Sequence, residues 1–366
     1  MIAEFPVGGG EPVGGPQVAV GRLVRKLAER GLDVVIVAPD ASGSRETVTQ
    51  LKEGSTLITV PAGGRWTLAR GMQPWRKRAV AVVDSLGVDV VHGQGLLPGG
   101  IAAGDVEAAA PIVVTARGNA REDTAAEYSG VGGMTRAYLR DRLAGAAVER
   151  ADVVIGVNPE WTANIPRRPR RFVYIPNMID EDFFEHTREP APALVLFTGG
   201  TRAIKGWALL AEAWPHVREA VPEARLKVVN WPPGQMPPGI PSRHRDSVAV
   251  EGPLSSAEIA ERMVCATALV IPSSFEVSPI VLAEAWALGL PVVATPVGGI
   301  PALATGAAVL TERQPEVLAA SIVSVLSGGE HIDRLVAEGR RRAEAHRPDA
   351  VASAHIELYD ELLHSG

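Results

Sequence analysis

Short β-branched runs alternate with longer amphipathic segments along most of the chain, and this alternation limits the fold more than any other feature. Each run is bounded by turn residues, which is typical of strands that are buried on both faces of a parallel sheet. Segments such as 17–31, which ends on Gly31, have the apolar spacing of helices and connect the runs. The sequence therefore predicts an α/β fold with parallel sheets.

The predicted strands form two series, one in each half of the chain. The first series is LDVVIVAP (32–39), VDVVHG (88–93), PIVVTA (111–116) and ADVVIGV (151–157). The second is LVLFTG (194–199), ARLKVVN (224–230), VAVEG (248–252), ATALVIPS (266–273) and PVVAT (291–295). A chain of 366 residues is also too long for one compact core. Two series of this kind predict two doubly wound domains.

The boundary between the two predicted domains falls in the charged segment 178–192, which contains Pro190 and Pro192 and has no clear period. We therefore predict a first domain over 1–185 and a second over 186–346. The remaining segment, 347–366, holds an amphipathic helix whose apolar stripe needs a surface to cover.

The composition excludes several classes of protein. The single cysteine, Cys265, rules out an intrachain disulfide and a cysteine-based metal site. No apolar run approaches the roughly 20 residues of a membrane span. Residues 1–10 have neither the basic start nor the apolar stretch of a signal peptide, so we expect a cytoplasmic protein. The net charge of −6 argues against a general nucleic-acid-binding protein.

Glu284 is the one polar residue in an otherwise apolar run from Pro279 to Leu290. Its neighbours on a helix, among them Ile280 and Leu288, are apolar, so its own face is predicted to be buried. Burying an unpaired carboxylate costs on the order of several kcal/mol, so something must satisfy it. A ribose diol that donates two hydrogen bonds is one candidate, and a protein arginine or backbone amide is the other.

The start of this helix has the features of an anion site. Ser278 is a good N-cap and Pro279 a good first helical residue. Glu276 then lies in the loop at the helix mouth, and the N–H groups of Ile280 and Val281 point out of it. A nucleotide sugar fits this layout, with its sugar near Glu276, its diphosphate at the helix end and its ribose at Glu284.

A glycine-rich loop, TGGTRAIKG (198–206), follows the first strand of the second half. Gly199 and Gly200 let the backbone approach a ligand closely. Arg202 and Lys205 add cations of the kind that a diphosphate leaving group needs. The alternative is that these residues serve turn geometry and surface charge alone. The loop lies at the carboxyl end of a strand, where ligands of open α/β sheets bind.

The candidates in the first half are weaker. The loop 7–17 lacks the G-x-G-x-x-G pattern, so a dinucleotide cofactor is not expected, and Gly15 opens either an anion-contacting helix mouth or a tight turn. His92 ends a predicted strand and is either a cleft residue or a structural histidine. The basic runs 76–78 and 167–171 are interpreted as solvated surface, with contact to a membrane surface or an acidic acceptor as the alternative.

These motifs, in this order, resemble the retaining glycosyltransferases of family 4. The similarity covers nearly the whole chain and is strongest over 251–301, where the E-x7-E signature of the family matches Glu276 and Glu284. Further matches are VGGPQVAVGRLVRKLAERGLDVVIV, DVVHGQG, ADVVIGV and IPNMID. The resemblance implies the GT-B fold, in which two Rossmann-like domains face each other across a cleft. The first domain then lies on the acceptor side, the second binds the nucleotide-sugar donor, and the final helix packs back on the first.

The resemblance also implies residue roles. Glu276 would bind the donor sugar and Glu284 the ribose, while the amides of Ile280 and Val281 would hold the diphosphate beside Lys205. The implied catalytic residues are Glu276, Lys205 and Arg202, and the implied donor-binding residues are Gly15, Gly199, Gly200, Lys205, Glu276, Ser278, Ile280, Val281 and Glu284. Candidates for the acceptor or sugar cleft are His92, Arg117 and Asn119.

Three positions depart from the family pattern. The arginine that usually lies five residues before the lysine is Gly200 here, and Arg202 is its candidate substitute. The cleft histidine of the family is replaced by Arg117. The glycines that usually follow the first glutamate are Val277 and Pro279.

The implied activity is that of a retaining hexosyltransferase. It would move a sugar from a nucleoside-diphosphate sugar, with UDP favoured over GDP, to a hydroxyl of a sugar, lipid-linked or small-molecule acceptor. No metal or cofactor is expected, because lysine and a helix dipole can stabilise the departing diphosphate. A sugar-nucleotide epimerase and a non-catalytic nucleotide-sugar-binding subunit are the alternatives on the same fold. Weak contact with the inner face of a membrane is left open.

Overall fold

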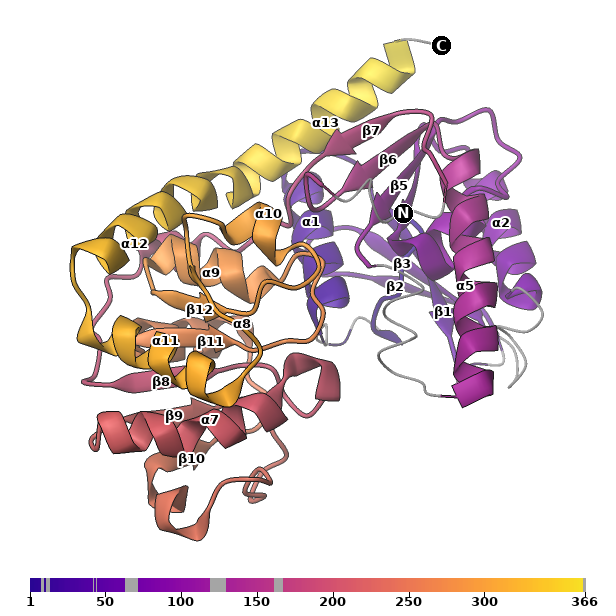
Figure 1. Ribbon diagram of the computed structural model, residues 1–366. Coiled ribbons are helices and arrows are strands. Elements are labelled where there is room, and N and C mark those ends of the chain that lie inside the picture. Colours follow the sequence, from indigo (N-terminus) through magenta and orange to yellow (C-terminus); the bar gives the residue numbers. More distant parts are fainter. Residues whose placement is uncertain are drawn as a thin grey trace. The chain divides into compact units, whose positions relative to one another are not determined.

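The computed structural model describes residues 1–7, 10, 14–41, 43, 45–62, 72–118, 130–160 and 167–364. The chain divides into two compact units (Figure 1). Unit 1 comprises Met1–Met178 and Pro348–Gly366, and unit 2 comprises Ile179–Arg347. The boundary between unit 1 and unit 2 therefore lies between residues 178 and 179, whereas the sequence predicted a domain boundary between 185 and 186. The difference arises because Phe183, in helix α6 (Asp182–Glu185), is buried in the core of unit 2.

Unit 1 contains a mostly parallel sheet built from two groups of strands. One group is β1 (Val35–Asp40), β2 (Thr47–Gln50) and β3 (Thr56–Pro61), in the order β1-β3-β2. The other is β4 (Val91–Gln94), β5 (Ile112–Ala116), β6 (Val153–Gly156) and β7 (Phe172–Tyr174), in the order β4-β5-β6-β7. Ile2 forms parallel bridges to Val37 and to Gly93, so the first residues of the chain lie between the two groups. Only β2 runs antiparallel to its neighbour among these strands.

Helices cover both faces of this sheet. Within the described residues, the helices of unit 1 are α1 (Gly15–Glu29), α2 (Gln73–Leu86), α3 (Ile101–Ala103), α5 (Gly130–Arg150) and α13 (Pro348–His364), and a kinked segment, Gly95–Gly100, with extended backbone at Leu97 precedes α3. Leu23 and Leu27 of α1 share a core cluster with Val351 and Leu358 of α13. Trp75 and Ala79 of α2 belong to a second cluster with residues of β1, β3 and β4. The final helix is thus part of unit 1, where Lys26 pairs with Asp349 at 3.0 Å.

Unit 2 contains a parallel sheet of six strands in the order β10-β9-β8-β11-β12-β13. These are β8 (Leu194–Phe197), β9 (Arg225–Val228), β10 (Val248–Val250), β11 (Ala268–Ile271), β12 (Val292–Ala294) and β13 (Val309–Leu310). Besides α6, its helices are α7 (Trp207–Ala220), α8 (Ser256–Cys265), α9 (Ile280–Leu288), α10 (Ile300–Ala304), α11 (Pro315–Ser327) and α12 (Glu330–Ala343), with 3-10 turns at Ala203–Lys205, Ser242–Ser247 and Glu344–His346. Residues of α6, α8, α9 and α10 form one core cluster, and those of α7 and α11 form another.

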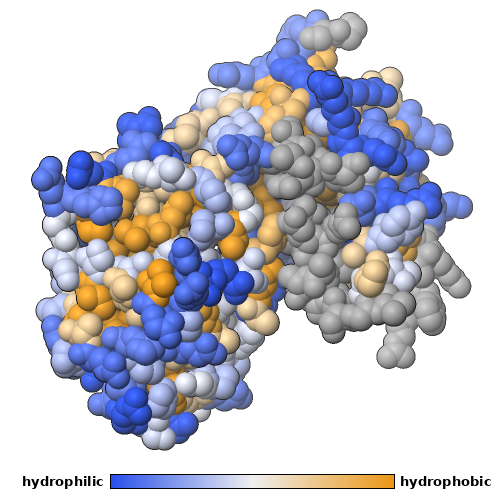
Figure 2. Space-filling view, viewed as in Figure 1, coloured by the Kyte–Doolittle hydropathy of each residue, from blue (hydrophilic) through white to orange (hydrophobic). Residues whose placement is uncertain are grey.

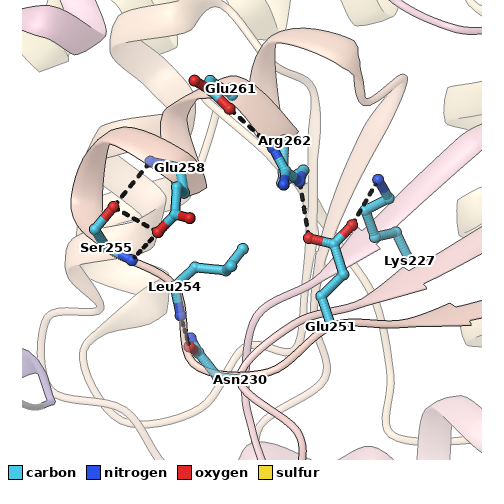
Figure 3. A network of polar contacts seen from close by, with 8 residues as sticks. All are labelled: Lys227, Asn230, Glu251, Leu254, Ser255, Glu258, Glu261 and Arg262. Atoms are coloured by element: carbon cyan, nitrogen blue, oxygen red, sulfur yellow. Dashed lines mark hydrogen bonds and ion pairs between the residues drawn. The ribbon is translucent and has the colours of Figure 1, made fainter. Parts of the chain in front are cut away.

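A polar network holds the start of α8 against the sheet of unit 2 (Figure 3). Ser255 and Glu258 form a capping box, in which each side chain satisfies a backbone N–H of the other residue. Glu251, which follows β10, accepts hydrogen bonds from Lys227 of β9 at 2.9 Å and from Arg262 of α8 at 2.8 Å. The network fixes the loop that connects β10 to α8.

The basic run 76–78 is not simply solvated surface, and that interpretation is wrong for Arg76. Its side chain is buried, and its Nε atom donates to the carboxylate of Asp105 at 2.6 Å. The run 167–171 is exposed as predicted, but Arg167, Arg170 and Arg171 form ion pairs with Glu149, Asp152 and Glu361 respectively. These pairs leave little unpaired positive charge on the segment.

Hydrophobic residues reach the surface of unit 2 as separate patches between hydrophilic ones (Figure 2). Within the described residues, we find no helix with both the length and the apolar character needed to cross a bilayer.

Candidate active site

The strand order of unit 2 creates a crevice at the carboxyl edge of its sheet. The chain passes from β8 to β9 on one side, and β11 pairs with β8 on the other side. Loops that follow two such strands lead in opposite directions and leave space between them, which is where open α/β sheets bind ligands. Here the two loops are 198–206, after β8, and 272–279, after β11.

Lys205 and Glu276 meet at this crevice. The Nζ atom of Lys205 lies 2.7 Å from Oε1 of Glu276, and the hydroxyl of Ser273 donates to the same oxygen at 2.7 Å. The Glu276 side chain is only 10% exposed and that of Lys205 is 29% exposed, so the pair is partly shielded from water. The structure therefore brings together the two charged residues that the sequence assigned to sugar and diphosphate.

Two glycines set the backbone around this pair. Gly206 has a φ of +77°, and a Cβ atom there would lie 1.9 Å from the carbonyl oxygen of Pro272. Gly298 has a φ of +54°, and its Cβ would lie 2.0 Å from the carbonyl oxygen of Glu276. The next residue, Gly299, donates its N–H to that same carbonyl at 2.8 Å. Only glycine allows both close approaches, because any other residue would displace the loops.

The helix behind the pair begins one residue later than predicted. Pro279, and not Ser278, occupies the N-cap position of α9, because Pro279 has an extended ψ of 117° and the helix starts at Ile280. The N–H groups of Ile280 and Val281 lie in the first turn, where a helix has no acceptor for them. Glu284 is 7% exposed, as its helical neighbours predict, and it is not isolated from other groups. Both a ribose and a protein group remain candidate partners of its carboxylate.

The other predicted donor residues are placed as follows. Gly199 and Gly200 follow β8, and a Cβ at Gly200, whose φ is +63°, would lie 3.0 Å from the carbonyl oxygen of Asn230. Arg202 is exposed, and its backbone carbonyl accepts a hydrogen bond from the N–H of Lys205; within the described part of the chain its side chain makes no hydrogen bond or ion pair. The structure thus does not bring the Arg202 side chain to Glu276.

The predicted residues of unit 1 lie in different places: Arg117 directly follows β5, whereas His92 is the second residue of β4. Gly15 is the first residue of α1 and is exposed. Asn119 lies outside the described residues. His92 is 2% exposed, and both of its ring nitrogens are engaged, with the Tyr359 hydroxyl at 2.6 Å and the Thr115 hydroxyl at 2.7 Å. This geometry favours the structural alternative for His92.

Arg117 belongs to the same polar cluster. Its guanidinium donates to Oε1 of Gln94 at 3.0 Å and 2.8 Å, and to Oδ1 of Asn177. The sequence interpretation missed Gln94 and Tyr359 as members of this cluster, although Gln94 directly follows the predicted strand 88–93. Tyr359 could not have been found in this way, because it is 267 residues away from His92.

Burial determines the charge of this cluster. It lowers the pKa of His355, which stacks on His92, to about 4, and it lowers the pKa of His92 well below its usual value. Burial also lowers the pKa of Arg117, to about 10. Near pH 7 both histidines are therefore neutral, and Arg117 is still a cation.

Two family models match the chain. One, described as Glycosyltransferase Family 4, matches residues 13–183, and the other, described as Glycosyl transferases group 1, matches residues 192–328. A D-inositol 3-phosphate glycosyltransferase of Xylanimonas cellulosilytica is 26% identical over 94% of this chain and 91% of the relative. Another with this description, of Geodermatophilus obscurus, is 29% identical over 97% of this chain and 87% of the relative.

Solved structures share the fold over the whole chain. Sucrose-phosphate synthase from Thermosynechococcus elongatus has a TM-score of 0.81 at 21% identity, with 100% of this chain and 99% of that chain covered. Anabaena HepE in complex with UDP-glucose has a TM-score of 0.70 at 15% identity, covering 100% and 99%. WaaG, a glycosyltransferase involved in lipopolysaccharide biosynthesis, has a TM-score of 0.69 at 20% identity, covering 97% and 99%.

The close approach of Gly298 to Glu276 gives a test of the site backbone. Gly298→Ala should lower the free energy of unfolding by about 2–3 kcal/mol, since its Cβ would collide with a carbonyl oxygen in addition to the cost of the positive φ. Gly87→Ala is the control, because Gly87 has a left-handed backbone with φ +60° and ψ +47° but no atom within 4 Å of its Cβ position. It should lose only about 1 kcal/mol. Urea unfolding measures both, and equal losses would contradict the close approach.

The buried histidines predict a loss of stability in acid. Burial lowers the pKa of His355 to about 4. In the unfolded chain this imidazole is therefore protonated below about pH 6.5, but in the folded chain only below about pH 4. Stability should therefore fall between pH 6.5 and pH 4, by about 3 kcal/mol from this residue. His355→Gln should flatten this part of the profile in urea unfolding followed by circular dichroism. His364→Gln, at an exposed histidine of the same helix, is the control, and an unchanged slope in His355→Gln would refute the assignment.

Proposed function

The chain belongs to glycosyltransferase family 4 and has the GT-B fold, and on that premise we propose that it is a retaining hexosyltransferase that uses a nucleoside-diphosphate sugar. The observation that carries the proposal is the Lys205–Glu276 pair at the crevice of the unit 2 sheet, next to the start of α9. A cation, a carboxylate and a helix N-terminus are the groups that phosphate and sugar hydroxyls require.

Charge stabilisation is the main contribution that this site would make to catalysis. When the bond between the sugar and the diphosphate breaks, negative charge grows on the leaving oxygen. The ammonium group of Lys205 and the N–H groups of Ile280 and Val281 would stabilise that charge without a metal ion. Within the described residues no cluster of three or more histidine, cysteine, aspartate or glutamate side chains has a geometry that could hold a metal.

Glu276 and Glu284 would divide the binding of the donor. The carboxylate of Glu276 would accept hydrogen bonds from sugar hydroxyls, which would replace part of its pairing with Lys205. Glu284, buried one turn into α9, would accept hydrogen bonds from the ribose. This division predicts different losses for the two residues.

We propose UDP as the nucleotide, with GDP next. The support is that a structural neighbour, Anabaena HepE, is described in complex with UDP-glucose. For the acceptor we propose a hydroxyl of a sugar or another small polyol, and the support is that the curated relatives are described as D-inositol 3-phosphate glycosyltransferases. A lipid-linked acceptor is the alternative. The proposed location is the cytoplasm, and the ion-paired arginines of 167–171 give only weak support to contact with a membrane surface.

The reaction is tested by incubating the full chain with UDP-glucose, GDP-mannose and a panel of sugar and polyol acceptors. A transferase releases UDP or GDP only in step with a new glycoside, and NMR coupling at the anomeric carbon shows whether the configuration is retained. An epimerase would instead convert the donor without an acceptor. A non-catalytic subunit would bind the nucleotide without turnover, and either of these results would reject the proposal.

Glu284→Gln should weaken UDP binding by roughly 5- to 100-fold, about 1–3 kcal/mol, because the ribose would lose a charged hydrogen-bond acceptor. Isothermal titration calorimetry measures this, with Glu219→Gln, at an exposed glutamate of α7, as the control. Unchanged UDP affinity in a folded Glu284→Gln protein would refute the ribose assignment. A lowered melting temperature with unchanged affinity would assign the carboxylate to a protein partner.

Glu276→Ala should leave UDP affinity unchanged within about threefold, because Lys205 remains free to bind phosphate, but should lower kcat with the sugar donor by roughly 100-fold or more. Ser273→Ala removes a hydrogen bond to the same carboxylate oxygen and keeps the carboxylate, so it should have a much smaller effect. Equal losses in UDP binding and in turnover for Glu276→Ala would show that the two glutamates do not divide the donor in this way.

A further inference from the structure

Arg117 is a fixed cation at the carboxyl edge of the unit 1 sheet. It directly follows β5, and its guanidinium is held by two amide oxygens, one from Gln94 at the end of β4 and one from Asn177 after β7. Two of its N–H groups donate to the same oxygen of Gln94, at 3.0 Å and 2.8 Å. Three hydrogen bonds, donated to residues of two separate segments, orient the planar group.

Both partners of this cation are neutral. Among the residues that the structure describes, no carboxylate lies within ion-pair distance of Arg117. Arg76, which is buried in unit 1, is by contrast paired with the carboxylate of Asp105. Arg117 is partly buried, and withdrawing a cation from water without a counter-ion costs free energy. Arg117 thus has the environment of a residue whose counter-ion comes from a ligand.

A chain of hydrogen bonds extends from Arg117 to the final helix. Because arginine only donates, Oε1 of Gln94 must face Arg117, and the amide nitrogen of Gln94 then faces the His92 ring, 3.1 Å from Nε2. The ring of His92 also contacts the Thr115 hydroxyl through Nε2 at 2.7 Å and the Tyr359 hydroxyl through Nδ1 at 2.6 Å. Near pH 7 the ring is neutral, because burial lowers its pKa well below the usual value.

We infer that Arg117 binds a phosphate oxygen of a substrate, and that Gln94, His92 and Tyr359 are the positioning residues that aim it. The inference rests on the proposed function, since that reaction supplies phosphate groups. The guanidinium fork matches the oxygens of a phosphate in geometry and charge, and arginine keeps its charge at any working pH. The phosphate belongs either to the donor diphosphate or to a phosphorylated acceptor.

Arg117→Ala and Arg117→Lys in the full chain test the binding role and identify the source of the phosphate. If the donor supplies it, Arg117→Ala should weaken UDP binding in calorimetry by roughly 10- to 100-fold, and Arg117→Lys by less. If the acceptor supplies it, UDP affinity should hold while KM for inositol 3-phosphate or glucose 6-phosphate rises by a similar factor. KM for inositol or glucose should then be unchanged. Millimolar guanidine should partly restore Arg117→Ala in either case.

The inference is overturned if a folded Arg117→Ala protein keeps both its UDP affinity and its KM for phosphorylated acceptors. Its failure is separable from that of the proposed function. If the wild-type chain transfers no sugar but Arg117→Ala still weakens UDP binding, the phosphate site stands and the transferase assignment fails. If the Arg117→Ala protein transfers sugar normally to every acceptor, the transferase assignment stands and the phosphate site fails.

Tyr359→Phe tests the positioning chain, because it removes only the hydroxyl that meets His92. It should weaken the same phosphate interaction by roughly three- to tenfold and leave kcat at saturating substrate nearly unchanged. Glu361→Gln is the control. Glu361 lies on the same helix as Tyr359 and pairs with Arg171 at 2.7 Å, but it takes no part in the hydrogen bonds that lead to Arg117. If both variants lower the melting temperature and neither changes phosphate affinity, Tyr359 has a structural role only.

Discussion

The ion pair between Lys205 and Glu276 joins two loops that are 71 residues apart in the sequence. In a doubly wound sheet the loops after two neighbouring strands diverge at the point where the strand order reverses, and β8 and β11 are those strands in unit 2. A cation and an anion at such a point offer a ligand two opposite contacts a few ångströms apart. The rest of unit 2 maintains this spacing, because the strands, the turns and α9 all converge on the two loops.

Backbone contact between the loops is what makes the spacing rigid. The Cα atom of Gly206 lies against the carbonyl of Pro272, and that of Gly298 lies against the carbonyl of Glu276. Each of these glycines has a positive φ, so both the conformation and the space exclude other residues. Glycine, commonly associated with mobility, here allows main chains to touch and thereby fixes the positions of Lys205 and Glu276.

Two arginines of unit 1, one buried and one partly buried, have different partners. Arg76 forms an ion pair with Asp105, which supplies its counter-ion. Within the described chain, Arg117 donates hydrogen bonds to amide oxygens only. The difference separates a cation that supports the fold from one that is set up for a ligand. The final helix takes part in this arrangement, because its Tyr359 and His355 close the polar cluster from the other end of the chain.

The sequence by itself determined the features that depend on local pattern. Alternating strands and helices predicted two parallel α/β sheets, the apolar neighbours of Glu284 predicted its burial, and the position of Lys205 and Glu276 after strands placed both at a sheet edge. Even there the observed start of α9 differs from the predicted start by one residue, because Pro279 and not Ser278 is the N-cap residue.

Only the tertiary structure decided which of these residues meet. The periodicity of a strand does not state its neighbours, so the contact of Lys205 with Glu276, the pairing of Arg76 with Asp105 and the place of Phe183 in unit 2 could not be derived from pattern. His92 shows the limit most clearly. Its position at a strand end suggested a cleft, but a tyrosine 267 residues away engages its ring, because strand order and the return of the final helix bring the two together.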